Sequence, residues 1–344
     1  MVLLLGLALA GCGDLVPVPT DAVEEQESNN TFTDATSTPV TAAAATEIQG
    51  TFTGTRDIDV YSLGTFAVGD TLAVDFQWRT LFSGGDLAAG LFDEEEDVAW
   101  LETDLDVTAS PRLFTHTVRK AGKYYLVLSM EKSFGALNYG YLATVTTGSG
   151  SVPSVSKQTV FLDYDGAVNV TIAGDLFYPE VRPFSDLSFP DPENLAGQIT
   201  DRIRQDYDGL NIEFISSYEG DEPVTPHAVL YLAANEGSYF GLADEIDWYN
   251  QNPNSEAIIF AGLLDTPSLT RQQFVVATAN VATHELGHLL GLIHTDDDTE
   301  LMDEATPILL LAIDQDFHRA PLADMSIGWE DTLELLTINL GEAP

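Results

Sequence analysis

The residues HELGHLLGLIH, at positions 284–294, indicate more about this chain than any other stretch. Histidines four apart on a helix lie on one face about one turn from each other, so His284 and His288 can reach the same ion. Glu285 follows the first histidine and can take a proton from a water molecule that such an ion activates. The first half of this stretch therefore predicts a helix that carries two metal ligands and a general base.

The second half of the stretch supplies a third ligand. Gly291 can adopt the left-handed conformation that ends a helix, so the chain can turn back and bring His294 to the same ion. Three protein ligands with an open fourth position are typical of catalytic zinc. In a randomly ordered chain of this composition the pattern would arise on the order of 10⁻⁵ times. Incidental histidines in a buried helix are therefore the weaker interpretation.

The stretch resembles the metzincin signature of zinc endopeptidases, H-E-x-x-H-x-x-G-x-x-H followed by a methionine turn. Met302 lies eight residues after His294, a spacing similar to that of the matrixins. The resemblance implies that one catalytic Zn²⁺ is held by His284, His288 and His294. It also implies that the side chain of Met302 lies beneath the zinc as a structural floor.

The same resemblance implies how a substrate binds and how it is cut. Glu285 would activate the attacking water, and a polypeptide substrate would lie extended along an edge strand. Residues 257–261 are our candidate for that edge strand or its neighbour. Thr295, which follows the third histidine, does not place the chain in one metzincin subfamily.

The N-terminus predicts export. Residues 2–11 form an apolar run too short to span a bilayer as a helix. Residues 9–12, LAGC, resemble a bacterial lipobox, which implies a lipoprotein signal peptide at 1–11 and a lipid on Cys12, the only cysteine of the chain. We therefore expect an exported bacterial lipoprotein at the outer membrane or cell surface. The alternative is an ordinary signal segment with an accidental cysteine.

The next two segments differ sharply in pattern. Residues 12–27 contain two prolines and several acids without apolar periodicity, which predicts an acidic tether. Residues 28–148 predict an all-β sandwich, because short alternating runs are separated mostly by Gly, Asp or Asn. The clearest alternating runs are 57–63, 71–76 and, less strictly, 124–128.

Residues 28–148 also resemble the bacterial prepeptidase C-terminal domain, through the stretches 27–32, 57–61 and 122–126. In some relatives of that domain, acidic residues at these positions bind calcium, and carboxylate and amide oxygens suit that ion. The alternative is that these are solvated turn residues. The residues that match the calcium-binding positions are Glu27, Asn29, Asn30, Asp57 and Asp59.

Residues 149–156 are rich in Gly and Ser and predict a linker. Residues 157–344 then predict a metzincin-like α/β catalytic domain with a mixed sheet and an active-site helix, so the whole chain is α+β with two domains. The supporting signals are strands at 159–164, 210–216, 228–233 and 257–261, a helix with Asp191 as N-cap and Pro192 in its first turn, a capping box of Thr270 and Gln273 before the histidines, and a further helix within 323–340.

The net charge of −42 makes nucleic acid an improbable partner, because its phosphates would be repelled. Residues 296–298, three aspartates directly after the histidine stretch, allow three interpretations. They are a solvated loop, an acidic rim that favours basic substrates, or a calcium site beside the zinc.

Taken together, these patterns predict a zinc-dependent endopeptidase that hydrolyses peptide bonds in extracellular proteins. Two alternatives remain open: a catalytically silent surface adhesin or binding lipoprotein, and a maturation protease with one partner substrate. Glu285 argues against the adhesin, since a binding module needs no general base. The sequence does not indicate an oligomeric state.

Overall fold

The computed structural model describes residues 21–54, 57–79, 85–105, 112–133, 138–174, 176–304 and 307–343. The chain divides into two compact units, Met1–Val152 and Pro153–Pro344, and the division falls within the stretch expected to be a linker. The expected signal peptide and Cys12 lie outside the described residues. Within the described part, no helix is long and apolar enough to cross a membrane.

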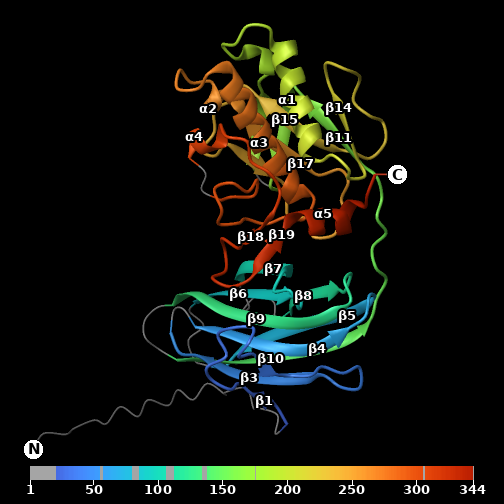
Figure 1. The fold of residues 1–344 in the computed structure, drawn as a ribbon, viewed down its shortest axis with the longest axis vertical. Helices are drawn as coiled ribbons and strands as arrows, with labels where there is room; N and C mark the ends of the chain where they lie inside the picture. The colour runs from blue at the N-terminus through green and yellow to red at the C-terminus, as the bar shows by residue number, and fades with distance from the viewer. Residues whose placement is uncertain are drawn as a thin grey trace, which may run out of the picture. The chain divides into compact units, whose positions relative to one another are not determined.

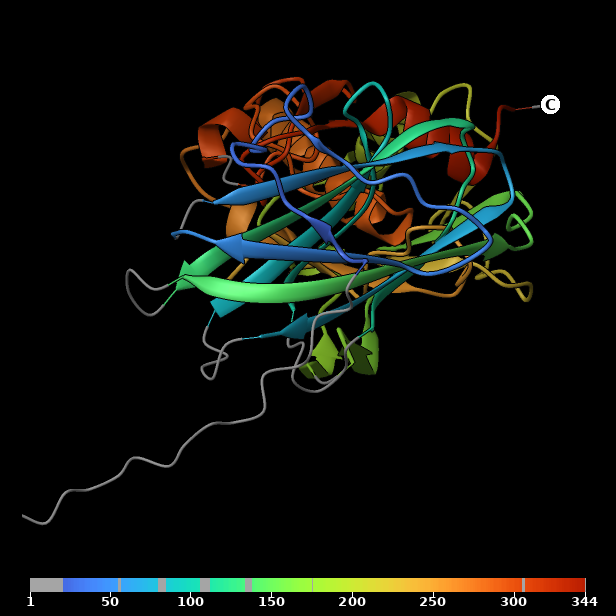
Figure 2. The ribbon, with the colours of Figure 1, turned by 90° about the horizontal axis from the view of Figure 1, so that it is seen from below.

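The first unit contains two five-stranded sheets, which Figures 1 and 2 show from two sides. The sheets face each other across an aromatic core. In this core the ring centroids of Trp100 and Phe114, one from each sheet, are 4.1 Å apart. One sheet has the order β1 (Val23–Glu24), β3 (Thr46–Phe52), β10 (Tyr139–Ser149), β5 (Asp70–Trp78), β8 (Arg112–Thr117); the other has the order β2 (Thr36–Ser37), β4 (Ile58–Phe66), β9 (Gly122–Ser133), β6 (Gly85–Phe92), β7 (Val98–Leu105).

The folded unit begins earlier than the sequence suggested, which corrects the boundary of the acidic tether. Strand β1 lies within 12–27 and pairs in parallel with β3, with Val23 opposite Ile48. Glu25 continues the contact, because its carboxylate accepts a hydrogen bond of 2.9 Å from the backbone N–H of Thr51. This strand has only two residues and therefore leaves no alternation for a sequence pattern to detect.

The second unit is built on a five-stranded sheet of the order β14 (Ile212–Ser216), β11 (Gln158–Asp163), β15 (Ala228–Ala233), β17 (Glu256–Phe260), β16 (Gly241–Ala243). The first four strands run in parallel, and β16 is an antiparallel strand at the edge. The sheet is therefore mixed, as expected. The candidate edge strand, β17, is the neighbour of the edge and not the edge itself. Two hairpins complete the unit: β12 (Ala167–Ile172) with β13 (Leu176–Val181), and β18 (Arg319–Pro321) with β19 (Trp329–Asp331).

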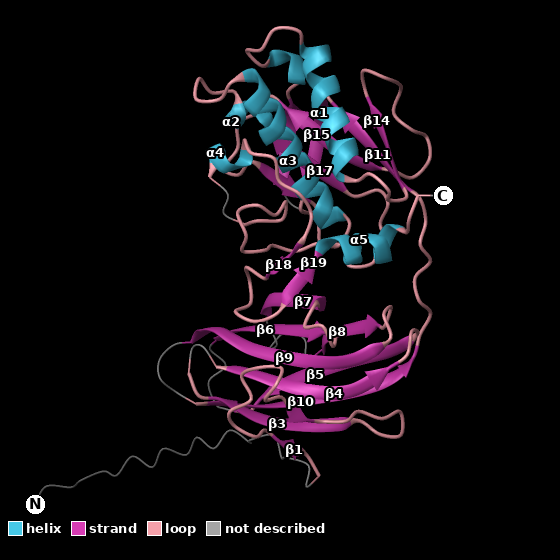
Figure 3. Ribbon diagram, in the orientation of Figure 1, coloured by secondary structure: helices cyan, strands magenta, loops and turns pink. Residues whose placement is uncertain are grey.

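All helices in the described residues lie in the second unit (Figure 3). They are the 3₁₀ helix η1 (Phe184–Asp186), α1 (Pro192–Asp206), α2 (Ala261–Leu264), α3 (Arg271–Leu289), α4 (Ile308–Leu311) and α5 (Thr332–Leu340). Helices α1 and α3 share one core with the sheet, where Leu162, Ile199 and Leu286 are fully buried. The opposite face of the sheet packs against the β12–β13 hairpin, through Val170 and Ile172 among others.

The helix ends test the capping signals. The capping box that opens α3 is confirmed, since the side chains of Thr270 and Gln273 each accept a hydrogen bond from the other's backbone N–H. Asp191 is the N-cap residue of α1 and Pro192 begins the helix, as expected, but the side chain of Asp191 makes no capping hydrogen bond. Asp191 has a φ of 60°, whereas a residue whose side chain caps a helix usually has an extended backbone.

Candidate metal centre and active site

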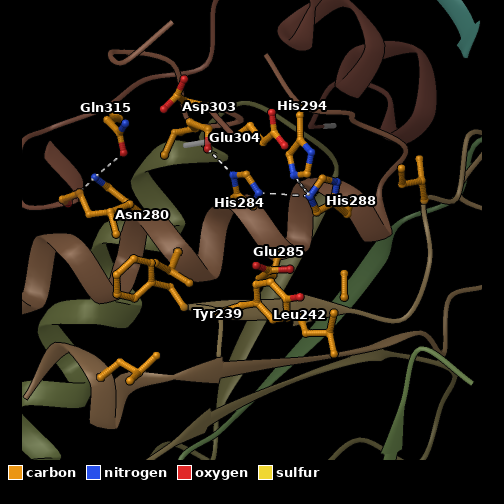
Figure 4. A pocket seen from close by; sticks show the side chains of 18 of the residues that line it. Tyr239, Leu242, Asn280, His284, Glu285, His288, His294, Asp303, Glu304 and Gln315 are labelled. Atoms are coloured by element: carbon orange, nitrogen blue, oxygen red, sulfur yellow. Dashed lines mark hydrogen bonds between the residues drawn. The ribbon is translucent and has the colours of Figure 1, made fainter. Parts of the chain in front are cut away.

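The three histidines of the motif meet at one point (Figure 4). His284 and His288 lie one turn apart on α3, and His294 follows the end of that helix. Atom Nε2 of His288 lies 3.1 Å from Nε2 of His284 and 3.2 Å from Nε2 of His294. The spacing in the sequence therefore produces the convergence that it predicted.

Backbone carbonyls set the direction of two of these rings. Nδ1 of His284 lies 2.8 Å from the carbonyl oxygen of Leu301, and Nδ1 of His288 lies 2.9 Å from that of Leu292. A carbonyl oxygen only accepts, so each Nδ1 carries the proton and each Nε2 presents a lone pair. Burial lowers the pKa of His284 to about 4 and that of His288 well below its usual value. Both rings are thus neutral at neutral pH and ready to bind a metal.

This donor set fits zinc. Nitrogen lone pairs that point at one another repel, whereas a cation placed between them is bound by all three. Zinc–nitrogen bonds of 2.0–2.1 Å in a tetrahedron place two nitrogens about 3.3–3.4 Å apart. The observed separations of 3.1 and 3.2 Å are close to this value. His284, His288 and His294 are therefore the residues that would hold the ion, with one position left open.

The loop that delivers His294 is held from several sides. Gly291 has a φ of +95°, which ends α3 in the left-handed conformation expected for it. The backbone N–H of Ile293 donates to the carboxylate of Glu330 on β19 at 3.0 Å. The side-chain amide of Asn339 on α5 donates to the carbonyl of Leu290 at 2.7 Å. Neither Glu330 nor Asn339 was predicted as a site residue, because each is separated by many residues from its partner in the loop.

Glu285 lies beside the three histidines and is 7% exposed. Burial raises the pKa of its carboxyl to about 8, and a hydrogen bond from the backbone N–H of Ala243, on β16, lowers it in part. Figure 4 shows the carboxylate near Leu242 of the same strand. The group expected to act as the base thus lies between α3 and the edge of the sheet, in the lining of the same cavity as the three histidines.

Met302 is fully buried against α3. A Cβ placed on Gly287 would lie 2.5 Å from Sδ of Met302, so the sulfur occupies the space that this glycine leaves one residue before His288. The turn that presents Met302 is closed by Thr295, whose backbone N–H donates to the carbonyl of Met302 at 2.9 Å. The sulfur of Met302 therefore packs against α3 at Gly287, the residue before His288.

A cavity of about 690 Å³ opens over these groups and includes His284, Glu285, His288 and His294 in its lining. Its apolar wall contains Leu242, Val281, Leu301 and Leu311, and its acidic residues besides Glu285 are Glu245, Asp303 and Glu304. The three aspartates at 296–298 are not part of the lining. The acidic character that the sequence suggested for a cleft rim thus comes from other residues.

In the first unit, four of the five residues matched to calcium-binding positions come together. Carboxylate oxygens of Glu27, Asp57 and Asp59 lie within 4.8 Å of one another. Asn29 is fully buried beside them, since its backbone carbonyl accepts from Val60 at 3.0 Å. Atom Oδ1 of Asn29 and Oδ1 of Asp59 have no hydrogen-bond partner. Asn30, the fifth residue, is exposed.

Comparisons with known proteins agree with this geometry for part of the chain. A family model described as matrixin matches residues 182–311, a range that contains the three histidines, Glu285 and Met302. No curated protein matches the chain. The family match supports a zinc metallopeptidase of the metzincin type in the second unit.

Several solved structures show more distant similarity. An archaemetzincin from Methanopyrus kandleri is 15% identical, and the match covers 55% of this chain and 98% of that one with a TM-score of 0.31. A periplasmic inhibitor of g-type lysozyme from Aeromonas hydrophila is 16% identical over 37% of this chain and 100% of that one, with a TM-score of 0.26. A family two carbohydrate esterase from Cellvibrio japonicus is 7% identical over 55% and 68%, with a TM-score of 0.17.

Proposed function

We propose that the second unit is a zinc-dependent endopeptidase that hydrolyses peptide bonds in extracellular proteins. The observation that carries this proposal is the convergence of three Nε2 atoms beside the buried carboxylate of Glu285, on the wall of an open cavity. Three nitrogen donors, a carboxylate and space for a substrate are the parts that metal-assisted hydrolysis needs.

The residues of the site have different roles in that reaction. Zinc, when bound, supplies a Lewis acid that polarises the scissile carbonyl and acidifies water. His284, His288 and His294 hold it and leave one side open to the cavity. Glu285 takes the proton of the attacking water on a carboxylate oxygen and delivers it to the leaving amine nitrogen. The apolar cavity wall limits the access of other water molecules.

We place the backbone of the substrate along β16. The N–H of Phe260 donates to the carbonyl of Phe240 at 2.8 Å, and the N–H of Asp244 donates to Glu256 at 2.9 Å. In an antiparallel pair, alternate residues direct their backbone groups to opposite sides. Gly241 thus directs its N–H and C=O groups, and Ala243 its C=O group, away from β17, where an extended peptide can add as a further strand.

Two substitutions test the catalytic proposal. Glu285→Ala removes the base but leaves all three nitrogen donors, so zinc content is retained and kcat falls roughly 10²-fold or more. His288→Ala removes a ligand, so zinc and activity are lost together. Both are compared with the parent in a peptide-library digest and by metal analysis. Equal cleavage by Glu285→Ala would refute the role of the carboxylate.

The same digest separates the alternatives. Broad cleavage supports a degradative endopeptidase. Cleavage of one partner protein, with the library left intact, indicates a maturation protease. If the zinc-loaded parent cleaves neither, the second unit is a binding module and the catalytic proposal is wrong.

We propose that the protein is an exported lipoprotein anchored through Cys12, on the resemblance of LAGC at 9–12 to a lipobox. Cys12→Ser then abolishes labelling with a radioactive fatty acid and moves the protein from the membrane to the soluble fraction. Retention of the variant in the membrane contradicts the anchor.

We also propose that the two units are separate domains, so that a fragment from residue 157 onward folds and binds zinc alone. An insoluble fragment without zinc contradicts that division.

We further propose that the first unit binds Ca²⁺ at Glu27, Asp57 and Asp59. The support is the convergence of three carboxylates with the unpartnered oxygens of Asn29 and Asp59. Calcium added to the parent raises the melting temperature of the first unit, and Asp57→Asn reduces that increase. Asp75→Asn, on another strand of the same unit, serves as the control. An equal response of Asp57→Asn and the parent to calcium contradicts this site.

A further inference from the structure

Gly241, on the edge strand β16, faces the carboxylate of Glu285 at very short range. A Cβ built on Gly241 would lie 2.4 Å from Oε1 of Glu285, 2.5 Å from its Cγ and 2.7 Å from its Cδ. These are the three nearest heavy atoms, and all belong to one side chain. Glu285 therefore occupies the space into which any other residue at position 241 would project its side chain.

The backbone of Gly241 gives no other reason for a glycine. Its φ is not among the positive values of this chain, and it pairs with Ile259 in regular antiparallel register. Any residue can adopt this conformation. The requirement for glycine at this position is therefore one of space, and the three closest atoms in that space belong to Glu285.

A second residue of the same strand acts on Glu285. The backbone N–H of Ala243, two residues further along β16, lowers the pKa of the Glu285 carboxyl and so favours its charged form. Gly241 and Ala243 are the two residues of β16 whose backbone groups point away from β17.

We propose that Gly241 is a positioning residue for the hydrolysis: by having no side chain, it leaves the space beside β16 in which the Glu285 carboxylate lies next to the three histidines. This inference rests on the proposed role of Glu285 as the base. A general base must lie within about 2.6–3.2 Å of the group whose proton it takes. A small displacement of Glu285 therefore removes its function while the metal ligands stay in place.

If a Cβ is added to Gly241, we expect the side chain of Glu285 to move and strand β16 to stay in place. Strand β16 is fixed by its pairing with β17, whereas the end of a glutamate side chain can rotate about its torsions. Opening a contact from 2.4 Å to an ordinary van der Waals distance of about 3.5 Å moves the carboxylate by about 1 Å. Misplacement of a catalytic group by 1 Å costs on the order of 10²-fold in rate.

Gly241→Ala in the zinc-loaded, full-length protein tests this. We expect kcat to fall tenfold to a hundredfold, with zinc content and the unfolding midpoint unchanged. Gly197→Ala is the matched control, because a Cβ at that position meets no atom within 4 Å, and its kcat equals that of the parent. A rise in KM with kcat unchanged would mean that the added methyl group obstructs the substrate and would overturn the proposal.

A double-mutant cycle separates positioning from a general loss of structure. In the Glu285→Ala background there is no carboxylate to displace, so Gly241→Ala has no further effect on the residual rate. If Gly241→Ala lowers the rate by the same factor in both backgrounds, it does not act through Glu285 and the proposal fails.

A crystal structure keeps this test independent of the proposed function. If the parent cleaves no peptide, the endopeptidase proposal fails, but the position of the carboxylate remains measurable. Zinc-loaded crystals of the parent and of Gly241→Ala should show the Glu285 carboxylate displaced by about 1 Å, with the imidazoles of His284 and His288 unmoved. A carboxylate in the same place in both crystals overturns the inference.

Discussion

Glu300 joins the two ends of the turn that presents Met302, and its removal lowers the free energy of unfolding of the second unit. The side chain is fully buried. One carboxylate oxygen accepts from the hydroxyl of Thr295 at 3.0 Å and from the backbone N–H of Met302. The other accepts, at 3.4 Å, from the backbone N–H of His318. Glu300→Ala deletes all of these acceptors at once.

The size of the loss follows from the donors left behind. Two well-formed bonds are lost, and a buried donor left unsatisfied costs about 1–3 kcal/mol, so the sum is about 2–6 kcal/mol. Burial also raises the pKa of Glu300, so its removal relieves part of a desolvation penalty. We therefore expect the free energy of unfolding of the second unit to fall by about 3 kcal/mol, a large part of the roughly 5–15 kcal/mol typical of a domain.

Hydrogen exchange resolved to peptides of the second unit measures that free energy apart from the first unit. Asp298→Ala is the control, because this side chain lies exposed in the same loop and exposed substitutions change stability by about 0.5 kcal/mol or less. If Glu300→Ala also changes the free energy of unfolding by less than about 0.5 kcal/mol, the carboxylate does not hold the turn and the reasoning above is wrong.

Three further outcomes are expected, each measured by urea unfolding against the parent. Burial raises the pKa of Asp206, which is hydrogen-bonded to Thr283, to about 6. Above about pH 4 the folded metal-free protein therefore keeps a proton that the unfolded chain releases, so the free energy of unfolding falls as pH rises from about 4 to 6. Asp206→Asn removes this fall. Thr270→Ala breaks the capping box of α3 and lowers the free energy of unfolding by about 1 kcal/mol. Gly291→Ala lowers the free energy of unfolding by about 2 kcal/mol or more, because position 291 has a φ of +95° and the added Cβ would lie 2.7 Å from the carbonyl oxygen of Asp247. A difference between Asp206→Asn and the parent that does not change with pH contradicts the raised pKa of Asp206. An unchanged free energy of unfolding in Thr270→Ala or Gly291→Ala contradicts the role given to the capping box or to the glycine.

The features that the sequence predicted correctly depend on neighbours along the chain. The convergence of His284 and His288 follows from a spacing of four on one helix, and the capping box follows from a spacing of three. Strand β15 was expected at 228–233 and lies there, because six apolar residues bounded by polar loops have few other solutions. Such patterns are decided within a few residues, so a sequence can indicate them.

The features that the sequence missed depend on contacts made across the fold. Strand β16 has three residues and no periodicity, so only its pairing with β17 reveals it. Glu300 and Glu330 are acids in short loop-like stretches of a chain with a net charge of −42, where a solvated surface residue is the ordinary interpretation. Both are fully buried. Most of their partners are backbone amides, which carry no side-chain signature in a sequence.

The two backbone carbonyls that orient the imidazoles have a consequence for the choice of metal. The carbonyls of Leu301 and Leu292 hold His284 and His288 through bonds that need no ion. Binding an ion therefore freezes little additional motion in these two rings. Among divalent first-row metals, copper binds a given set of nitrogen donors more tightly than zinc does. The three nitrogens alone therefore do not select zinc, and the metals supplied where the protein is loaded help to decide which ion it holds.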